Sequence, residues 1–296
     1  MGLLAQIRLE LRSLVELYLL PALAVPLPWP LAYRLLRWLA RYPGLYEEEW
    51  RPALAQARRF VPIDDERDWA WRFRTTRLVD HADFWLSRTR SHRWARRHFD
   101  RNGDWPLTGT AAVGVFFHWC AGLWAVRDLR AHGPTSAVLA RRPSARSMGG
   151  AWLGYWYGRM RLGELARISG RPLIYAPGTV QRARDDLAAG IWVIGTPDVP
   201  PTETRYGVPV TLFGQPAHFA EGLLLIARRA QVPIVVFTLA LDFATGRREL
   251  RIHGPFAAEE PQLLQWVADY WQSLLREKSW GFTLWPMMPG YFAAPA

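Results

Sequence analysis

The sequence predicts an α/β fold: a mostly parallel sheet flanked by helices on both faces, preceded by an amphipathic helical segment at the amino terminus. From about residue 107 onward, short apolar runs of strand length alternate with stretches of helical periodicity, as in strand–helix–strand units. Before that point, apolar residues recur at helical spacing with charged residues between them. A length of 296 residues accommodates one large domain with an accessory segment. We expect a helical, membrane-associating region over residues 1–100 and one continuous α/β core over residues 101–296.

The amino-terminal region has the pattern of two helices that lie on a membrane surface. Leucine, isoleucine, valine and tyrosine recur at helical spacing over residues 3–19, and a second pattern with a basic face covers residues 31–41. Four prolines between residues 21 and 30 interrupt the uncharged stretch that joins them, so a straight transmembrane helix is not expected. Glu10 and Glu16 break the apolar run that a secretory signal needs. The alternative is that both helices only cap the core.

Composition favours an anionic partner. The net charge is +11, and 17 tryptophans are present, a residue that concentrates where an apolar body meets water. An excess of positive charge attracts phospholipid head groups, nucleic acid or an acidic carrier protein. Residues 50–100 interleave arginine with tryptophan in a helical pattern, but no nucleic-acid-binding motif accompanies them, so we expect no nucleic acid partner. The single cysteine, Cys120, excludes an internal disulfide and a cysteine-based zinc site, and we expect no metal and no bound cofactor.

The elements of the core follow from the alternating pattern. Strands are expected where apolar runs lie between turn residues, and helices where a period of about 3.6 residues is sustained. In chain order, the expected strands are 111–117, 136–140, 172–176, 191–195, 233–241 and 247–253, with 210–213 as a short strand or a loop. The expected helices between and after them are 119–131, 148–168, 180–189, 221–230 and 262–277. Because parallel strands need crossover helices, this order implies a largely parallel sheet covered on both faces.

Residues that can carry chemistry follow three of the expected strands. His118 ends the buried run 111–117, Arg141 and Arg142 end the next strand, and Asp198 follows a later one. The carboxyl ends of parallel strands meet at one edge of a sheet, so His118 and Asp198 can lie together although 80 positions separate them. An imidazole at that edge is suited to proton transfer. A core histidine whose ring is satisfied by the backbone is the alternative.

The order and spacing of several segments carry a family resemblance. The segments are His118, Arg142-Pro143, Pro197-Asp198 and Phe213-Gly-Gln-Pro216, followed by the strand over residues 233–241. This set, within residues 30–285, resembles the lysophospholipid acyltransferase superfamily, most closely its branch of bacterial lipid A late acyltransferases. The resemblance implies transfer of a fatty acyl group from an acyl carrier protein or coenzyme A thioester to a hydroxyl of a membrane lipid. It also implies a peripheral or monotopic protein on the cytoplasmic face of the bacterial inner membrane.

One position departs from the family pattern. The family pairs its histidine with Asp or Glu five residues later, whereas Leu123 occupies that position here and no carboxylate occurs over residues 119–126. The resemblance makes His118 the general base toward the acceptor hydroxyl, with Asp198 as the leading substitute for the missing acid. Glu221 is a second candidate. A turn residue and a first-turn helix acid are the respective alternatives for Asp198 and Glu221.

The expected substrate-binding residues are Arg141, Arg142 and Glu221. A guanidinium group matches the oxygens of a phosphate, which a lipid head group or a phosphopantetheine arm supplies, and the resemblance gives Arg142 precedence. An ordinary ion pair is the alternative for both arginines. A covalent role for Cys120 is disfavoured because a small buried thiol is commonplace. The missing acid leaves a second class of function open: a catalytically weakened relative that binds acyl lipid or a carrier protein without turnover.

Overall fold

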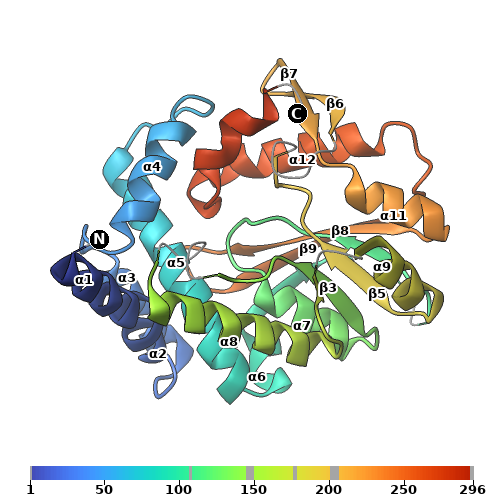
Figure 1. Ribbon diagram of the computed structural model, residues 1–296. Helices are drawn as coiled ribbons and strands as arrows, with labels where there is room; N and C mark the ends of the chain where they lie inside the picture. The colour runs from blue at the N-terminus through green and yellow to red at the C-terminus, as the bar shows by residue number, and fades with distance from the viewer. Residues whose placement is uncertain (1, 107–108, 145–149, 176–178, 201–206, 294–296) are drawn as a thin grey trace.

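A seven-stranded sheet forms the centre of the computed structural model, which describes residues 2–106, 109–144, 150–175, 179–200 and 207–293 (Figure 1). The strands are β1 Phe99–Asn102, β2 Val113–Val115, β3 Ser136–Ala140, β4 Ile174–Tyr175, β5 Trp192–Gly195, β6 Val208–Leu212, β7 Gln215–Phe219, β8 Ile234–Leu241 and β9 Arg248–Phe256. The sheet has the order β1-β9-β8-β2-β5-β3-β4, and β6 and β7 form a separate hairpin. The five strands from β8 to β4 are parallel, whereas β9 runs antiparallel to β8 and pairs in parallel with β1. The predicted class, α/β with a mostly parallel sheet, is confirmed.

Helices cover both faces of the sheet. Consecutive strand residues point to opposite sides, so the apolar strands place side chains under both layers of helices. The helices are α1 Leu3–Ser13, the π-helical η1 Leu14–Leu19, α2 Leu20–Ala22, α3 Trp29–Leu39, α4 Glu47–Ala57, α5 Glu66–Thr89, α6 His92–Arg97, α7 Leu123–Ala131, α8 Trp152–Ser169, α9 Thr179–Ala188, α11 Gly222–Ala230, α12 Leu263–Glu277, and the 3-10 turns η3 Ser279–Gly281 and η4 Trp285–Tyr291. Val193 and Val236 pack with α9, α11 and α12 on one face. Their neighbours Ile194 and Val235 pack with α3, α7, α8 and the second half of α5 on the other face.

The amino-terminal helices lie where the periodicity predicts them. α1 and η1 are continuous over residues 3–19, and α3 follows the proline-rich stretch. Pro30 falls in the first turn of α3, where the N–H that proline lacks has no partner inside the helix, and Pro21 lies in the last turn of the continuous helical stretch 3–22. None of the helices in the described part of the chain combines the length and the apolar character that crossing a bilayer requires.

Helix α3 and helix α5 are tied to the sheet at β9. The indole Nε1 of Trp29 donates a hydrogen bond to the carbonyl of Gly246 at 2.9 Å, and the Arg248 guanidinium lies 3.9 Å from the centre of the Trp29 ring. Arg248 also forms a buried ion pair with Asp83 of α5. A cation held between a carboxylate and an aromatic face stabilises both contacts at once. Helices α3 and α5 are therefore held against the sheet at the start of β9.

The helix predicted over residues 119–131 begins later, at Leu123. Trp119 instead forms an isolated antiparallel bridge with Phe282, and the backbone N–H of Cys120 donates to the carbonyl of Gly281 at 2.7 Å. Cys120 has a φ of +55°, a left-handed conformation that cannot continue a helix. The apolar pattern over 119–131 was ambiguous because a buried loop segment shows the same residue types as a buried helix. The prediction was wrong for its first turn.

Two sheet elements were not predicted. Strand β1 is polar and mostly exposed, so its sequence lacks the apolar alternation of a strand, and only pairing with β9 defines it. Strand β7 contains Pro216, a residue that argues against a strand, yet it pairs with β6 in a hairpin that stands apart from the main sheet. Phe213 and Gly214 have φ values of +51° and +75°, which is the conformation of a two-residue hairpin turn. The segment Phe213-Gly-Gln-Pro216 therefore begins with a tight turn.

Candidate functional site

His118 and Asp198 meet at the carboxyl edge of the sheet. His118 follows β2 and Asp198 follows β5, and these strands are neighbours with Val115 opposite Gly195. The imidazole Nδ1 of His118 lies 2.9 Å from Oδ1 of Asp198. The backbone N–H of His118 donates to Oδ2 of the same carboxylate at 2.5 Å. Both carboxylate oxygens therefore hold one residue, and they fix the backbone and the ring of His118 together.

This geometry decides which ring nitrogen is available. An ionised carboxylate only accepts hydrogen bonds, so the Nδ1 of His118 carries a proton and the lone pair of the neutral ring is on Nε2. The Asp198 side chain is fully buried, whereas the His118 side chain keeps 43% of its surface exposed. The acid is sealed from solvent and the base is open to it. A substrate hydroxyl can thus approach Nε2 without displacing Asp198.

The charge of Asp198 also sets the protonation of His118. Burial by itself would lower the pKa of the imidazole, but the charge of Asp198 and its hydrogen bond raise that pKa by more, and the net direction is above the ordinary value. The carboxylate therefore stabilises the imidazolium that forms whenever the ring takes up a proton. A base whose conjugate acid is stabilised in this way is suited to proton transfer.

Sequence reasoning missed a second charged pair near His118. Asp80 of α5 accepts a 2.6 Å bond from the Nη2 of Arg161 on α8, and its other oxygen lies 3.2 Å from Nη1 of Arg77. Arg161 lowers the pKa of His118 and Asp80 raises it, both by smaller effects than Asp198. No motif marks this pair in the sequence, because α5 and α8 are far apart along the chain. Only an (i, i+3) spacing links Arg77 to Asp80, and such spacing is common on helices.

The loop after His118 is fixed by the carboxyl-terminal part of the chain. The buried Trp119 donates its indole N–H to the carbonyl of Lys278 at 3.1 Å, and the backbone N–H of Cys120 donates to the carbonyl of Gly281. Burial, only partly offset by a hydrogen bond from the backbone of Leu241, raises the pKa of the Cys120 thiol to about 12. A thiol in that state stays protonated at neutral pH, which gives no support to a thiolate nucleophile.

The predicted substrate-binding residues lie apart from the dyad. Arg142 is exposed after β3, with its guanidinium 4.8 Å from the centre of the Tyr175 ring on β4, and Arg141 is exposed beside it. Two strand spacings, roughly 10 Å, separate β3 from β2, the strand that His118 follows. Glu221 precedes α11 and its carbonyl accepts from Leu225 at 2.9 Å. Within the described residues, no hydrogen bond or ion pair connects the Glu221 carboxylate with His118.

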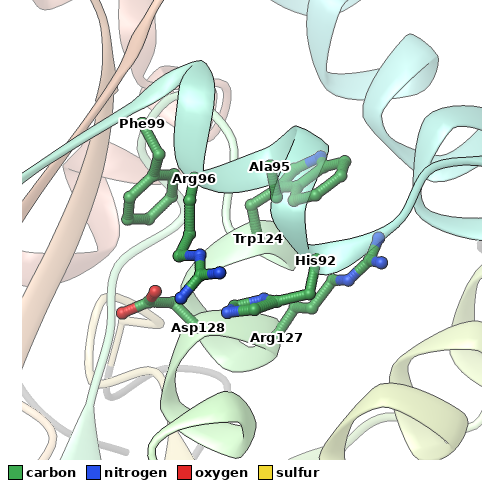
Figure 2. A pocket seen from close by; sticks show the side chains of 7 residues that line it. All are labelled: His92, Ala95, Arg96, Phe99, Trp124, Arg127 and Asp128. Carbon is green, nitrogen blue, oxygen red and sulfur yellow. The ribbon is translucent and has the colours of Figure 1, made fainter.

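Figure 2 shows a small pocket away from the dyad, between α6 and α7. It is lined by His92, Ala95, Arg96, Phe99, Trp124, Arg127 and Asp128. Arg127 donates from Nη1 to the carbonyl of Ser87 at 3.1 Å and from Nη2 to that of Arg90 at 2.5 Å, so its side chain caps the carboxyl end of α5. None of the predicted site residues contributes to this pocket. Across the described ranges, no cluster of three or more His, Cys, Asp or Glu side chains is arranged to hold a metal ion.

Comparison with known proteins adds no relative. No protein-family model matches the chain, and no curated protein matches it significantly. The chemistry available to the site follows from its geometry. That geometry is a histidine with a buried acid on one ring nitrogen and an open second nitrogen, a combination typical of general base catalysis.

We expect the imidazole of His118 to titrate above its ordinary range. In Asp198→Asn its pKa should fall below that range, because burial and the charge of Arg161 still lower the pKa and the negative charge of Asp198 no longer raises it. In Arg161→Gln it should rise further. A group whose pKa is raised in the folded state adds stability that is present at low pH and is lost as the pH rises through the folded pKa. NMR titration of ring-labelled protein measures all three values.

The matched control for this titration is Arg167→Gln. Arg167 lies on the same helix as Arg161, and the substitution removes the same charge. Arg167 pairs with Glu164, however, whereas Arg161 pairs with Asp80. We expect it to leave the titration of His118 unchanged. Equal shifts in both variants would mean that Arg161 acts only through the overall charge of the protein.

Proposed function

We propose that this protein is a membrane-associated acyltransferase that moves a fatty acyl group from an acyl carrier protein or coenzyme A thioester to a hydroxyl of a lipid. It works on the cytoplasmic face of the bacterial inner membrane. The observation that carries the proposal is the hydrogen bond from Nδ1 of His118 to the fully buried Asp198, while 43% of the His118 side chain stays exposed. The sequence resemblance to lipid A late acyltransferases supports it, and supplies the substrate class.

The reaction is a proton-coupled acyl transfer. Nε2 of neutral His118 takes the proton of the acceptor hydroxyl while its oxygen attacks the thioester carbonyl carbon and forms the new C–O bond. The tetrahedral intermediate then expels the thiolate as the C–S bond breaks, and the imidazolium returns the proton to the leaving sulfur. Asp198 holds the ring in the required tautomer and stabilises its cation between the two steps. Arg142 and Arg141 bind the phosphate of the acceptor or of the donor's arm.

Asp198 takes the part of the acid that the family places five residues after its histidine. Leu123, at that position, is a buried first residue of α7, so a carboxylate there would stand in an apolar core. Asp198 reaches Nδ1 of His118 from the neighbouring strand instead. The net charge of +11 suits an acidic carrier protein as the donor.

The test is acyl transfer from radiolabelled acyl carrier protein, and from acyl coenzyme A, to hydroxylated lipids in vesicles. His118→Ala is expected to reduce transfer by about 10²-fold or more. His132→Ala is the matched control, because His132 is also partly exposed but bonds to the carbonyl of Asp128 at the end of α7. Transfer that survives in His118→Ala contradicts the mechanism. Tight lipid binding without transfer by the wild-type protein identifies a binding module instead.

A further inference from the structure

The exposed apolar side chains gather in two segments of the chain. Thirteen large hydrophobic residues are exposed in the described structure, and twelve of them are Leu3, Leu4, Ile7, Leu11, Val15, Leu19, Leu23, Leu31, Trp38, Tyr42, Trp152 and Trp156. The first ten belong to residues 3–42, and the two tryptophans belong to the first turns of α8. The thirteenth, Val180, stands on α9. Exposed apolar residues in such a group mark an interaction surface, whereas scattered ones do not.

The two segments are joined by Glu10. Its Oε1 accepts from the backbone N–H of Trp152 at 2.7 Å and its Oε2 accepts from that of Leu153 at 2.9 Å. Ala151, the residue before α8, offers no side-chain cap, so Glu10 satisfies the free N–H groups of that helix from 142 positions away. The hydroxyl of Tyr18 donates to the carbonyl of Leu153 at 2.8 Å. Helices α1 and α8 therefore lie in contact, as Figure 1 shows.

The exposed charges on the two segments themselves are cationic, and the nearest exposed acid bonded to them is Glu48 of α4, which pairs with Arg12. Glu10 and Glu16 are the only acidic residues between positions 2 and 42. Glu10 is used by the α8 cap, and Glu16 is buried, where it accepts from the backbone N–H of Tyr46 at 2.6 Å. The exposed charged residues on these segments are Arg8, Arg34, Arg41 and Arg159. A surface that is both apolar and cationic is complementary to anionic lipid and repels a second copy of itself.

We propose that residues 3–42 and the start of α8 form one docking surface for an anionic bilayer, and that Glu10 holds its two parts together. This surface deepens the proposed function, on which its biological meaning rests. Helix α8 leads from Trp152 at the surface to Arg161, whose charge acts on the pKa of His118, over a length of roughly 14 Å for nine residues.

Vesicle flotation with the full chain tests the surface. Vesicles of phosphatidylcholine with phosphatidylglycerol should bind the protein, and vesicles of phosphatidylcholine alone should bind it much more weakly. Trp152→Ser/Trp156→Ser should weaken binding by about 10-fold or more, since two apolar side chains no longer insert. Val180→Ser, the exposed apolar residue outside the surface, should bind as wild type. Because no acyl donor is present, His118→Ala should also bind as wild type, so this result is independent of catalysis.

Glu10→Ala distinguishes the structural role of Glu10, which caps α8 and joins it to α1 (the Glu10 clamp), from the effect of its negative charge on binding. Removing an acid normally strengthens binding to anionic vesicles, but here we expect weaker binding, because the cap that joins α1 to α8 is lost. Glu48→Gln, which removes an exposed acid paired with Arg12, should bind equally or more tightly. Tighter binding by Glu10→Ala overturns the clamp. Wild-type binding by the double tryptophan variant, or a lipid-free dimer that this variant dissociates, overturns the docking surface.

Discussion

Replacing Asp198 by Asn is expected to lower kcat/KM for acyl transfer by about 10²–10⁴-fold. Asn can still accept the hydrogen bond from the backbone N–H of His118, so the local fold should survive. It carries no charge, however, and cannot stabilise the imidazolium. Its amide NH₂ can also donate to Nδ1 and favour the tautomer with the proton on Nε2, where the acceptor hydroxyl must be deprotonated. Steady-state kinetics with acyl carrier protein thioesters measure the loss.

Glu221→Gln is the matched control for Asp198→Asn. It changes the same functional group in the second predicted acid, whose one hydrogen bond within the described ranges is accepted by its backbone carbonyl from the N–H of Leu225 in α11. We expect less than about a threefold effect on kcat/KM. The pH profile adds a second readout, since the remaining activity of Asp198→Asn should have its acidic limb at lower pH than wild type. Full activity in Asp198→Asn, with loss in Glu221→Gln, would reassign the acid.

The core strands were predictable because each carries its own signal. Strand β8 is apolar except for Thr238, and all eight of its residues are buried. Strand β1 is different: its residues are polar, and only the register with β9 makes it a strand. The hydrophobic pattern of the sequence identifies strands that are buried on both faces. It does not identify polar edge strands, which are defined by pairing with a neighbouring strand.

The site was predictable where topology alone brings residues together. His118 and Asp198 follow parallel strands, and any such strands deliver their carboxyl ends to one edge. Which strands are neighbours was not predictable, and the β2-β5 pairing is what gives hydrogen-bond contact. Arg161 and Asp80 lie on helices whose rotation about their own axes is set by packing. Their electrostatic effect on His118 therefore follows from tertiary structure and leaves no mark in the sequence.

Replacing Trp119 by Ala is expected to lower the free energy of unfolding by about 3–5 kcal/mol. Its ring is 1% exposed and belongs to the core between the sheet and α12. Trp119→Phe should cost less, since it keeps much of the packing and loses the indole bond to Lys278, which contributes about 1 kcal/mol. Urea denaturation measures both values.

Trp29 provides the control that separates stability from catalysis. It is also buried, at 2% exposure, and its indole also donates to a backbone carbonyl, that of Gly246. Trp29→Phe should therefore lose a similar amount of stability as Trp119→Phe. Only Trp119, however, immediately follows His118 and fixes the loop that presents the ring to Asp198. We expect Trp119→Phe alone to shift the titration of His118 and to lower kcat. Equal kcat values in the two variants would mean that the 118–120 loop holds its position through Asp198 alone, and that its contacts with η3 serve only the fold.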